Sequence, residues 1–494
     1  MIPAPDVIEE ALRAASRHPK CAAAIVLVEE LSQAEVRYAL NTTTTNGVRR
    51  DRTVTVIAIT AENSVGTARQ SGTPDPADLV KAALADAEGS PPAEDAMALL
   101  TPSDLAATHT GPIGIPFDTP PASVDLSALD TVLAGLAPAF TRARNRPHPV
   151  NLAGFAEYGI TTVYLGTSTG LRLAHAQPTG AVQLSALTAT AASAPASSAP
   201  ASAPASAWIG TPDVHADFAP LEDEIWRRLE WAAKTSPLPA GRYDVVMPPS
   251  AVTDMMACLH FFGLSGRDAE DGRSVFSAPS PGTTRLGELL STTPFTLYSD
   301  PYEPGVECLP FNAVGSSSSD VSVFDDGLPL GRTDWIHDGH LAALQYHRAG
   351  AAHSNLKPSP YIDNLILRAD PAPAPASPAP TSTSTSTSTD DLVAEVEHGL
   401  LLTCLWYIRE VDPTTFLMTG LTRDGVYVIE DGKVVGATNN FRFNESPLDL
   451  LARASRVGTP VRSLAREWGE YLNRTVMPPL RIPDFNMSSV SQAS

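Results

Sequence analysis

A histidine cluster is the densest group of potential metal ligands in the chain. His337 and His340 flank the dipeptide Asp338-Gly339, and His347 and His353 follow. Asp-Gly favours a tight hairpin turn, which would bring the two flanking imidazoles close enough to meet one metal ion. Histidines that are merely exposed at a turn explain the same pattern. Two alternatives therefore stay open. The protein could be a hydrolase that uses His337 and His340, or these histidines could belong to a turn that binds no metal.

A G-x-S-x-G pattern lies at residues 166–170, with Ser168 in the nucleophile position. A nucleophile elbow needs a strand that enters the turn and a helix that leaves it. Residues 171–176 alternate in the manner of a strand instead. The segment is therefore predicted to be a hairpin turn and not the active site of a serine hydrolase.

Paired carboxylates could supply an acid and a base. Asp325-Asp326 is followed by Gly327, and Asp300 and Glu303 lie upstream. Adjacent acids in a turn that contains glycine are usually solvated, so these residues are not expected to carry perturbed pKa values. The sequence also lacks the glycine-rich loops that bind nucleotide phosphates.

The composition excludes several classes of protein. The chain has 34 basic and 55 acidic residues, a formal net charge of -21, so no nucleic-acid partner is expected. Neither a secretory signal nor an apolar run of about 20 residues is visible, which predicts a cytoplasmic protein without a membrane span. The four cysteines lie far apart without a CxxC pair, which is typical of reduced, buried thiols.

The first part of the chain has the pattern of an α+β domain, predicted to cover residues 1–220. Helices are expected at residues 7–15 and after Asp75-Pro76, as N-cap and first helical residue. Short strands are expected between them, with a turn at Asn46-Gly47. A further helix over 126–144 precedes four short strands, which turns such as the one at residues 157–159 make into an antiparallel meander.

The rest of the chain, residues 221–486, is predicted to form an antiparallel β-rich, barrel-like domain. A helix over 250–263 has apolar residues at spacings of three and four, and the region after Pro294 reads as strands and turns, among them residues 321–324 and 341–346. Two low-complexity segments, 193–205 and 371–390, are expected to carry no fixed structure because they cannot bury enough apolar surface.

Several separated landmarks resemble the TldD/PmbA family. They occur in the family's order and together span most of the chain: residues 263–266 and 272–274, Ser299-Asp300-Pro301, residues 324–327, Asp338-Gly339, Asn364, and the long block 412–450 with its Asp431-Gly432 hairpin. Each motif alone is weak. Their order makes the resemblance specific, and it implies a protein related to a zinc peptidase built from two kinds of subunit.

The resemblance also implies where zinc ligands would lie, and this chain lacks them. In the metal-bearing subunit of that family, a helix presents His-Glu and a second His five positions after the first. The matching helix here has His260, then Phe261 in place of the glutamate, and Ser265 in place of the second histidine. The sequence has no His-Glu dipeptide, and no cysteine follows Cys404. The chain thus resembles the metal-free PmbA (TldE) type of subunit.

What the resemblance implies is a subunit without a cofactor of its own. It would pair with a zinc-bearing, TldD-like homologue, close the chamber around that zinc, and help to hold an unfolded or short peptide for cleavage. Arg442 and Asn444, which alternate with Phe441 and Phe443, could face the chamber and bind the peptide backbone. A stand-alone peptide-binding or scaffold protein without a protease role is the alternative.

Overall fold

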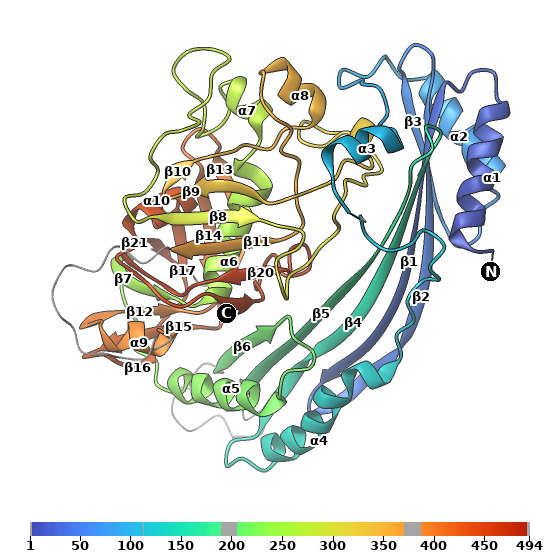
Figure 1. Cartoon of the computed structure of the whole chain (residues 1–494). Coiled ribbons are helices and arrows are strands. Elements are labelled where there is room, and N and C mark those ends of the chain that lie inside the picture. Colours follow the sequence, from blue (N-terminus) through green and yellow to red (C-terminus); the bar gives the residue numbers. More distant parts are fainter. Residues whose placement is uncertain (1, 112, 189–204, 370–386, 492–494) are drawn as a thin grey trace.

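The computed structural model describes residues 2–111, 113–188, 205–369 and 387–491. Within these ranges the chain is α+β, as expected, with three β-sheets and helices on and between them (Figure 1). No helix in the described ranges combines the length and the apolar character that crossing a membrane requires.

The first sheet is a six-stranded antiparallel sheet with the order β3-β2-β1-β4-β5-β6. Its strands bend across the molecule and pass beneath the C-terminal half (Figure 1). Their bounds are β1 Ala23–Ala39, β2 Thr42–Ile59, β3 Val65–Ser71, β4 Val150–Thr167, β5 Arg172–Thr188 and β6 Ser206–Thr211.

These strands are longer than the sequence predicts. The predicted turn at Asn46-Gly47 lies inside β2, and the turn predicted at residues 157–159 lies inside β4. β1 pairs with β2 on one side and with β4 on the other along most of its length, so the backbone groups of these segments are satisfied by ladder hydrogen bonds and local turn propensity is overridden. The chain reverses instead at Leu40 and Asn41, which both have positive φ.

Residues 166–170 include the end of β4 and most of its turn into β5, which confirms the hairpin that the sequence predicts there. Gly170 has a φ of +101°, a conformation that glycine adopts without strain. Ser168 uses its hydroxyl oxygen to accept a hydrogen bond from the backbone N–H of Ala24 at 3.0 Å. This serine therefore helps to hold the sheet.

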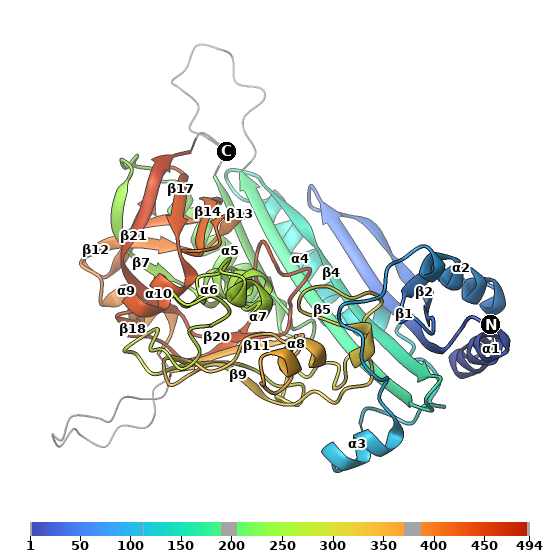
Figure 2. The same ribbon diagram turned by 90° about the horizontal axis from the view of Figure 1, so that it is seen from above.

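Helices cover the two ends of the first sheet. Figure 2 shows α1 (Ala4–Arg17) and α2 (Pro76–Glu88) together at the end that is far from the C-terminal sheets. The α2 start is as predicted, because Asp75 accepts a hydrogen bond from the backbone N–H of Ala77 and Pro76 is the first helical residue. η1 (Leu126–Leu129), α4 (Asp130–Arg144) and α5 (Phe218–Ala232) pack on the other end.

Two further sheets form the C-terminal half. One has the order β10-β9-β8-β11-β20-β19, and the other has β13-β14-β17-β21-β7-β12-β15-β16, with β18 pairing with β21. The bounds of the first are β8 Phe295–Ser299, β9 Thr333–His337, β10 His340–Leu341, β11 Leu365–Ala369, β19 Val461–Ser463 and β20 Thr475–Met477. Those of the second are β7 Gly241–Met247, β12 His398–Leu402, β13 Leu405–Asp412, β14 Leu417–Thr422, β15 Val426–Glu430, β16 Lys433–Ala437, β17 Phe441–Glu445, β18 Arg456–Val457 and β21 Leu480–Val490.

Helix α6 (Pro249–Cys258) lies in the core that these two sheets share. It continues as one π-helical turn, η2 (Leu259–Gly263), and its buried residues pack against strands of both sheets. The C-terminal half is rich in strands, as predicted, but both strand orders are open paths. Among the described residues the two sheets form no closed barrel, and helix α6 fills the space between them. The short helices are α3 Pro102–Thr108, α7 Gly266–Glu270, η3 Val323–Asp325, α8 Arg348–His353, α9 Thr389–Ala394 and α10 Pro447–Arg453.

Three other local predictions need correction. Residues 321–324 lead into the short 3-10 helix η3 instead of forming a strand, and the strand predicted over 341–346 is limited to β10. Most of the two low-complexity segments lies outside the described residues. At the end of the second one, however, Ser388 caps α9 through a reciprocal pair of hydrogen bonds with Asp391, so that part is structured.

The two halves of the molecule share a hydrophobic cluster. Ile25 and Leu165 of the first sheet pack with Phe311 and Phe324 of the C-terminal half. Helix α5, which spans the predicted domain boundary near residue 220, contacts both β6 and β16. The division into domains at 220 stays a prediction.

Candidate functional site

His260, the histidine on the helix that the family resemblance singles out, is fully buried in η2. Its Nε2 lies 2.9 Å from the carbonyl oxygen of Ile362, so Nε2 carries the proton and donates it. The ring lies 4.7 Å from the ring of Tyr361 and 5.7 Å from that of Trp335. Burial lowers the pKa of His260 to about 4, and the imidazole is neutral near pH 7. It behaves as a core histidine.

The neighbouring positions are structural as well. Phe261 stacks near Tyr361, with ring centroids 6.3 Å apart. Ser265 is the N-cap of α7, where its hydroxyl oxygen accepts a hydrogen bond from the backbone N–H of Asp268 at 3.3 Å. Residues 260–265 therefore offer a single imidazole, whose Nδ1 is buried without a hydrogen-bond partner, but no carboxylate base and no second imidazole. These residues do not fit a catalytic zinc ion.

The last cysteine does not complete such a site. Cys404 is buried, and burial raises the pKa of its thiol to about 12, whereas zinc binds the thiolate. In the part of the chain that the structure describes, no group of three or more histidine, cysteine, aspartate or glutamate side chains could hold a metal ion.

The histidine hairpin has the predicted geometry. His337 and His340 are paired across β9 and β10. His337 lies 2.9 Å from a carboxylate oxygen of Asp334, and Nδ1 of His340 lies 2.9 Å from the carbonyl oxygen of Asp338. His347 is the N-cap of α8, and its Nδ1 accepts a hydrogen bond from the backbone N–H of Gly350. One ring nitrogen of each of these three histidines therefore has a local partner, and a hydrolase that uses His337 and His340 stays a prediction.

The adjacent acids Asp325 and Asp326 are buried, which corrects the expectation of a solvated turn. Asp325 accepts a hydrogen bond from Nε of Arg348 at 2.8 Å. Asp326 accepts hydrogen bonds from the backbone N–H of Val314 at 2.7 Å and from Asn312 Nδ2 at 3.0 Å, and burial raises the pKa of its carboxyl. The pair fixes the loop that packs on the first sheet.

Arg442 and Asn444, the predicted peptide contacts, lie on β17 and alternate with buried Phe441 and Phe443, as the pattern indicates. Arg442 is exposed, and its Nη1 donates to the hydroxyl oxygen of Thr419 at 3.3 Å. The side-chain oxygen of Asn444 is buried without a hydrogen-bond partner. The two residues share one face of the nine-stranded sheet, and their role toward a peptide stays a prediction.

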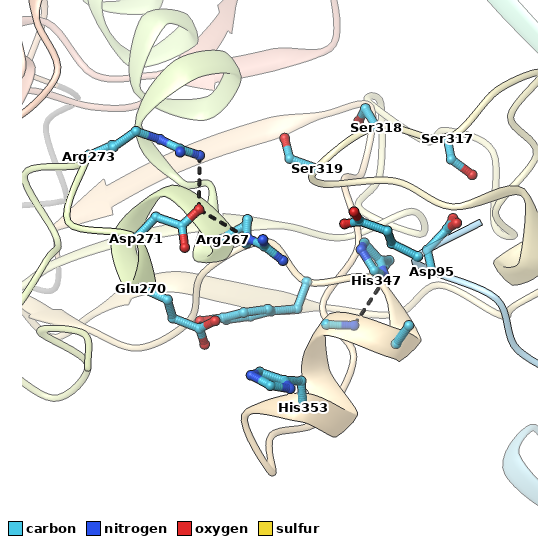
Figure 3. Close-up of a pocket in the computed structure, with 14 residues that line it drawn as sticks. Asp95, Arg267, Glu270, Asp271, Arg273, Ser317, Ser318, Ser319, His347 and His353 are labelled. Carbon is cyan, nitrogen blue, oxygen red and sulfur yellow. Dashed lines mark hydrogen bonds and ion pairs between the residues drawn. The ribbon is translucent and has the colours of Figure 1, made fainter. Parts of the chain in front are cut away.

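A polar cavity of about 650 Å³ lies between α7 and α8 (Figure 3). Its arginines are paired with acidic side chains. Asp271 accepts a hydrogen bond from Nε of Arg267 at 3.0 Å and lies 3.1 Å from Nη2 of Arg273. Glu270 accepts a hydrogen bond from the hydroxyl of Tyr346 at 2.8 Å. Asp95, which also lines the cavity, has a buried side-chain oxygen without a hydrogen-bond partner.

A second cavity of about 640 Å³ lies beside η2, and we call it the aromatic groove. Strands β4 and β5 of the first sheet form one side, and β13 with the segment 466–471 forms the other. The groove is lined by Phe155, Gln183, Phe262, Trp406, Ile408, Arg409, Glu410, Arg466, Glu467, Trp468, Glu470 and Tyr471. The sequence gives no signal for it, because its residues come from separate segments without a common motif.

Asp254 of α6 holds the segment that lines this groove. The carboxylate is fully buried and accepts hydrogen bonds from the backbone N–H groups of Arg466, Glu467 and Trp468 at 3.1, 2.9 and 3.2 Å. Burial raises the pKa of Asp254 to about 7. The three backbone hydrogen bonds favour the charged form and lower the pKa, but their effect is smaller than that of burial. The helix that carries the metal motif in the zinc subunit of the resembled family thus positions a groove wall here.

The C-terminal half of the chain matches a known protein family. Residues 240–489 match the family model described as the PmbA/TldA metallopeptidase C-terminal domain. No curated protein matches the sequence.

Solved structures share the architecture along the whole chain. TldE from Thermococcus kodakarensis superposes with a TM-score of 0.73 at 14% identity, covering 98% of this chain and 99% of that one. A proposed modulator of a DNA gyrase from Thermotoga maritima gives a TM-score of 0.68 at 13% identity, and one from Bacteroides thetaiotaomicron gives 0.71 at 14%, each with the same two coverages. At these identities the likeness concerns the fold. With half of its length matched by the family model, the chain belongs to the PmbA/TldD family of metallopeptidase-related proteins.

Proposed function

We propose that this chain is the metal-free subunit of a heteromeric TldD/PmbA-type zinc peptidase. In this role it pairs with a zinc-bearing homologue, closes the chamber around the zinc of that partner, and helps to bind unfolded or short peptides. The chain requires no cofactor of its own. Nucleic acid is not a partner, in keeping with the net charge of -21.

The single observation that carries the proposal is the chemistry of α6 and η2. His260 donates to a backbone carbonyl inside the core, Phe261 packs among aromatic rings, and Ser265 caps a helix. Hydrolysis by zinc needs imidazole or thiolate ligands, an open position for water and a base. A family member that keeps the architecture without this set is expected to depend on a partner for the reaction. The likeness to a structure named TldE supports the same reading.

The proposed compartment is the cytoplasm. In the described ranges all four cysteines are free, and three of them are buried. Unpaired thiols are typical of a reducing compartment.

Co-expression tests the proposed pairing. The chain is produced alone, together with a family member that carries the His-Glu motif, and together with a variant of that partner in which the glutamate is replaced by glutamine. We expect a stable complex with both partners, and cleavage of an unfolded peptide only with the unmodified one. A chain that forms no complex would instead favour the stand-alone scaffold.

A further inference from the structure

Arg466 is held in a fixed orientation at the wall of the aromatic groove. Its guanidinium carbon lies 5.2 Å from the ring centroid of Trp208 and 4.8 Å from that of Trp406. Trp208 belongs to β6 of the first sheet and Trp406 to β13 of the C-terminal half. Planar guanidinium groups stack favourably on such rings, so little side-chain freedom is left to lose on binding a ligand.

The charge of Arg466 has no carboxylate partner within ion-pair distance among the described residues. Its Nη1 donates to the side-chain oxygen of Gln183 at 3.3 Å, and that oxygen also accepts from Nε1 of Trp208 at 3.2 Å. The Nε of Arg466 is buried and has no hydrogen-bond acceptor. A partly desolvated guanidinium without a carboxylate partner is a strong site for a planar anion such as a carboxylate.

The other charges of the groove are arranged differently. Arg409 donates to a carboxylate oxygen of Glu467 at 2.9 Å, and the second oxygen accepts from the backbone N–H of Tyr407 at 3.0 Å, so this pair is satisfied. Glu410 and Glu470 are exposed. One unmatched cation beside exposed acids suits a ligand with a single carboxylate and a neutral or basic remainder, and it disfavours a polyanion.

Aromatic side chains next to Arg466 remain in contact with water. Phe262 is 44% exposed and Tyr471 is 69% exposed, and Trp468 packs between them with ring centroids 5.5 and 6.1 Å away. Large exposed aromatic groups that share one concave surface mark a place where an apolar group can be buried. The volume of about 640 Å³ is in the range of small-ligand sites.

From these observations we propose that the aromatic groove binds the C-terminal end of a peptide: Arg466 pairs with the terminal carboxylate, and Phe262, Trp468 and Tyr471 contact an apolar last side chain. The site deepens the proposed function, since it names the end of the substrate that this subunit holds. The inference rests on the proposed function in one respect, the choice of a peptide as the ligand.

The test measures binding by the isolated full-length chain, without any partner. The probe is the pentapeptide Gly-Ser-Ala-Ala-Phe with a dye at its amino end, prepared once with a free carboxylate and once as the C-terminal amide. Fluorescence anisotropy should show the acid binding about tenfold more tightly than the amide, and this preference should weaken as salt is raised. Arg466→Gln should abolish the preference, and Arg466→Lys should keep part of it, because lysine retains the charge without the planar fork.

Arg49→Gln is the matched control, since Arg49 is an exposed arginine paired with Asp51 on β2, and it should keep the full preference. Phe262→Ala should weaken binding of the peptide that ends in Phe and leave a peptide that ends in Gly unchanged. The proposal is overturned if the wild-type chain binds acid and amide equally or binds neither, or if folded Arg466→Gln still prefers the acid. If Arg466→Gln does not fold, the wild-type comparison and Phe262→Ala decide. None of these readouts depends on the zinc-bearing homologue, so a failure here is distinct from a failure of the proposed pairing.

Discussion

Asp254 on α6 accepts a hydrogen bond from the backbone N–H of Glu467 at 2.9 Å, although the two residues are 213 positions apart in the chain. Through this contact and the two neighbouring ones, a carboxylate in the core fixes the wall of a surface groove. The residue pair links α6, the helix that the family resemblance singles out, to the site that we propose for the peptide terminus.

The pKa of Asp254 predicts a pH dependence of stability. The folded-state pKa of about 7 lies above the ordinary value of 3.8, so the contribution of this group is fully present below pH 3.8 and is lost as the pH rises through 7. Asp254→Asn cannot ionise. We expect the free energy of unfolding of the wild type, minus that of Asp254→Asn, to fall by an amount of the order of 3 kcal/mol between pH 4 and pH 8. Urea unfolding at several pH values measures this difference; a difference that rises with pH would show that the carboxylate is stabilised in its charged form.

The pKa of His260 predicts the opposite pH dependence of the free energy of unfolding. Its folded-state pKa of about 4 lies below the ordinary 6.5. The contribution of this ring to stability is therefore fully present above pH 6.5 and is lost as the pH falls toward 4, because the buried ring must then accept a charge. Relative to His260→Gln, the wild type should lose about 3 kcal/mol over that interval. The same unfolding series checks this, with His148→Gln, at an exposed position, as the control. Parallel curves for wild type and His260→Gln would rule out a neutral core histidine.

Asn364 predicts a large loss of stability on truncation. Its side chain donates to the carbonyl oxygens of Asp300 and Val306 at 2.6 and 2.8 Å and accepts from the backbone N–H of Asp300 at 2.9 Å, all in the core. Asn364→Ala leaves those groups unpaired and should cost about 3 kcal/mol. Asn46→Ala, at an exposed position of β2, should change stability by less than about 0.5 kcal/mol. Chemical denaturation compares the two, and equal stabilities would contradict the structural role of Asn364.

Some elements could be predicted from sequence because one local signal decides them. Asp75-Pro76 starts α2, and the Asp431-Gly432 hairpin joins β15 and β16 as its dipeptide indicates. The sequence predicts turns at residues 46–47 and 157–159, but these residues lie inside the long strands β2 and β4. Pairing of these strands with the two sides of β1 outweighs the local turn propensity.

The candidate site was predictable only in part. Phe261 and Ser265, at the positions where the family resemblance implies metal-site residues, can be read from the sequence itself. The aromatic groove is not, because the importance of Arg466 lies in the absence of a nearby carboxylate, a property of tertiary packing. The burial of Asp325 and Asp326 was missed for the same reason: their partners Arg348 and Val314 lie outside the turn.

Arg442 and Asn444 provide a test of the sheet face as a peptide contact. Replacing both with Ala should lower the rate of peptide cleavage by the reconstituted pair several-fold, because Arg442 is exposed and Asn444 lies beside it on the same face of the sheet. The unfolding midpoint should change little. Thr42→Ala on β2 is the control, at another exposed strand position. Cleavage at the wild-type rate would remove the two residues from the substrate path.

The zinc content of the purified chain tests the proposed role most directly. Elemental analysis by mass spectrometry is applied to the chain alone and to its complex with the His-Glu-bearing homologue, after dialysis against metal-free buffer. We predict that the isolated chain retains no zinc and that the complex retains one zinc for each copy of the partner. Stoichiometric, tightly held zinc in the isolated chain would contradict the proposal that this subunit leaves the metal, and the hydrolysis, to its partner.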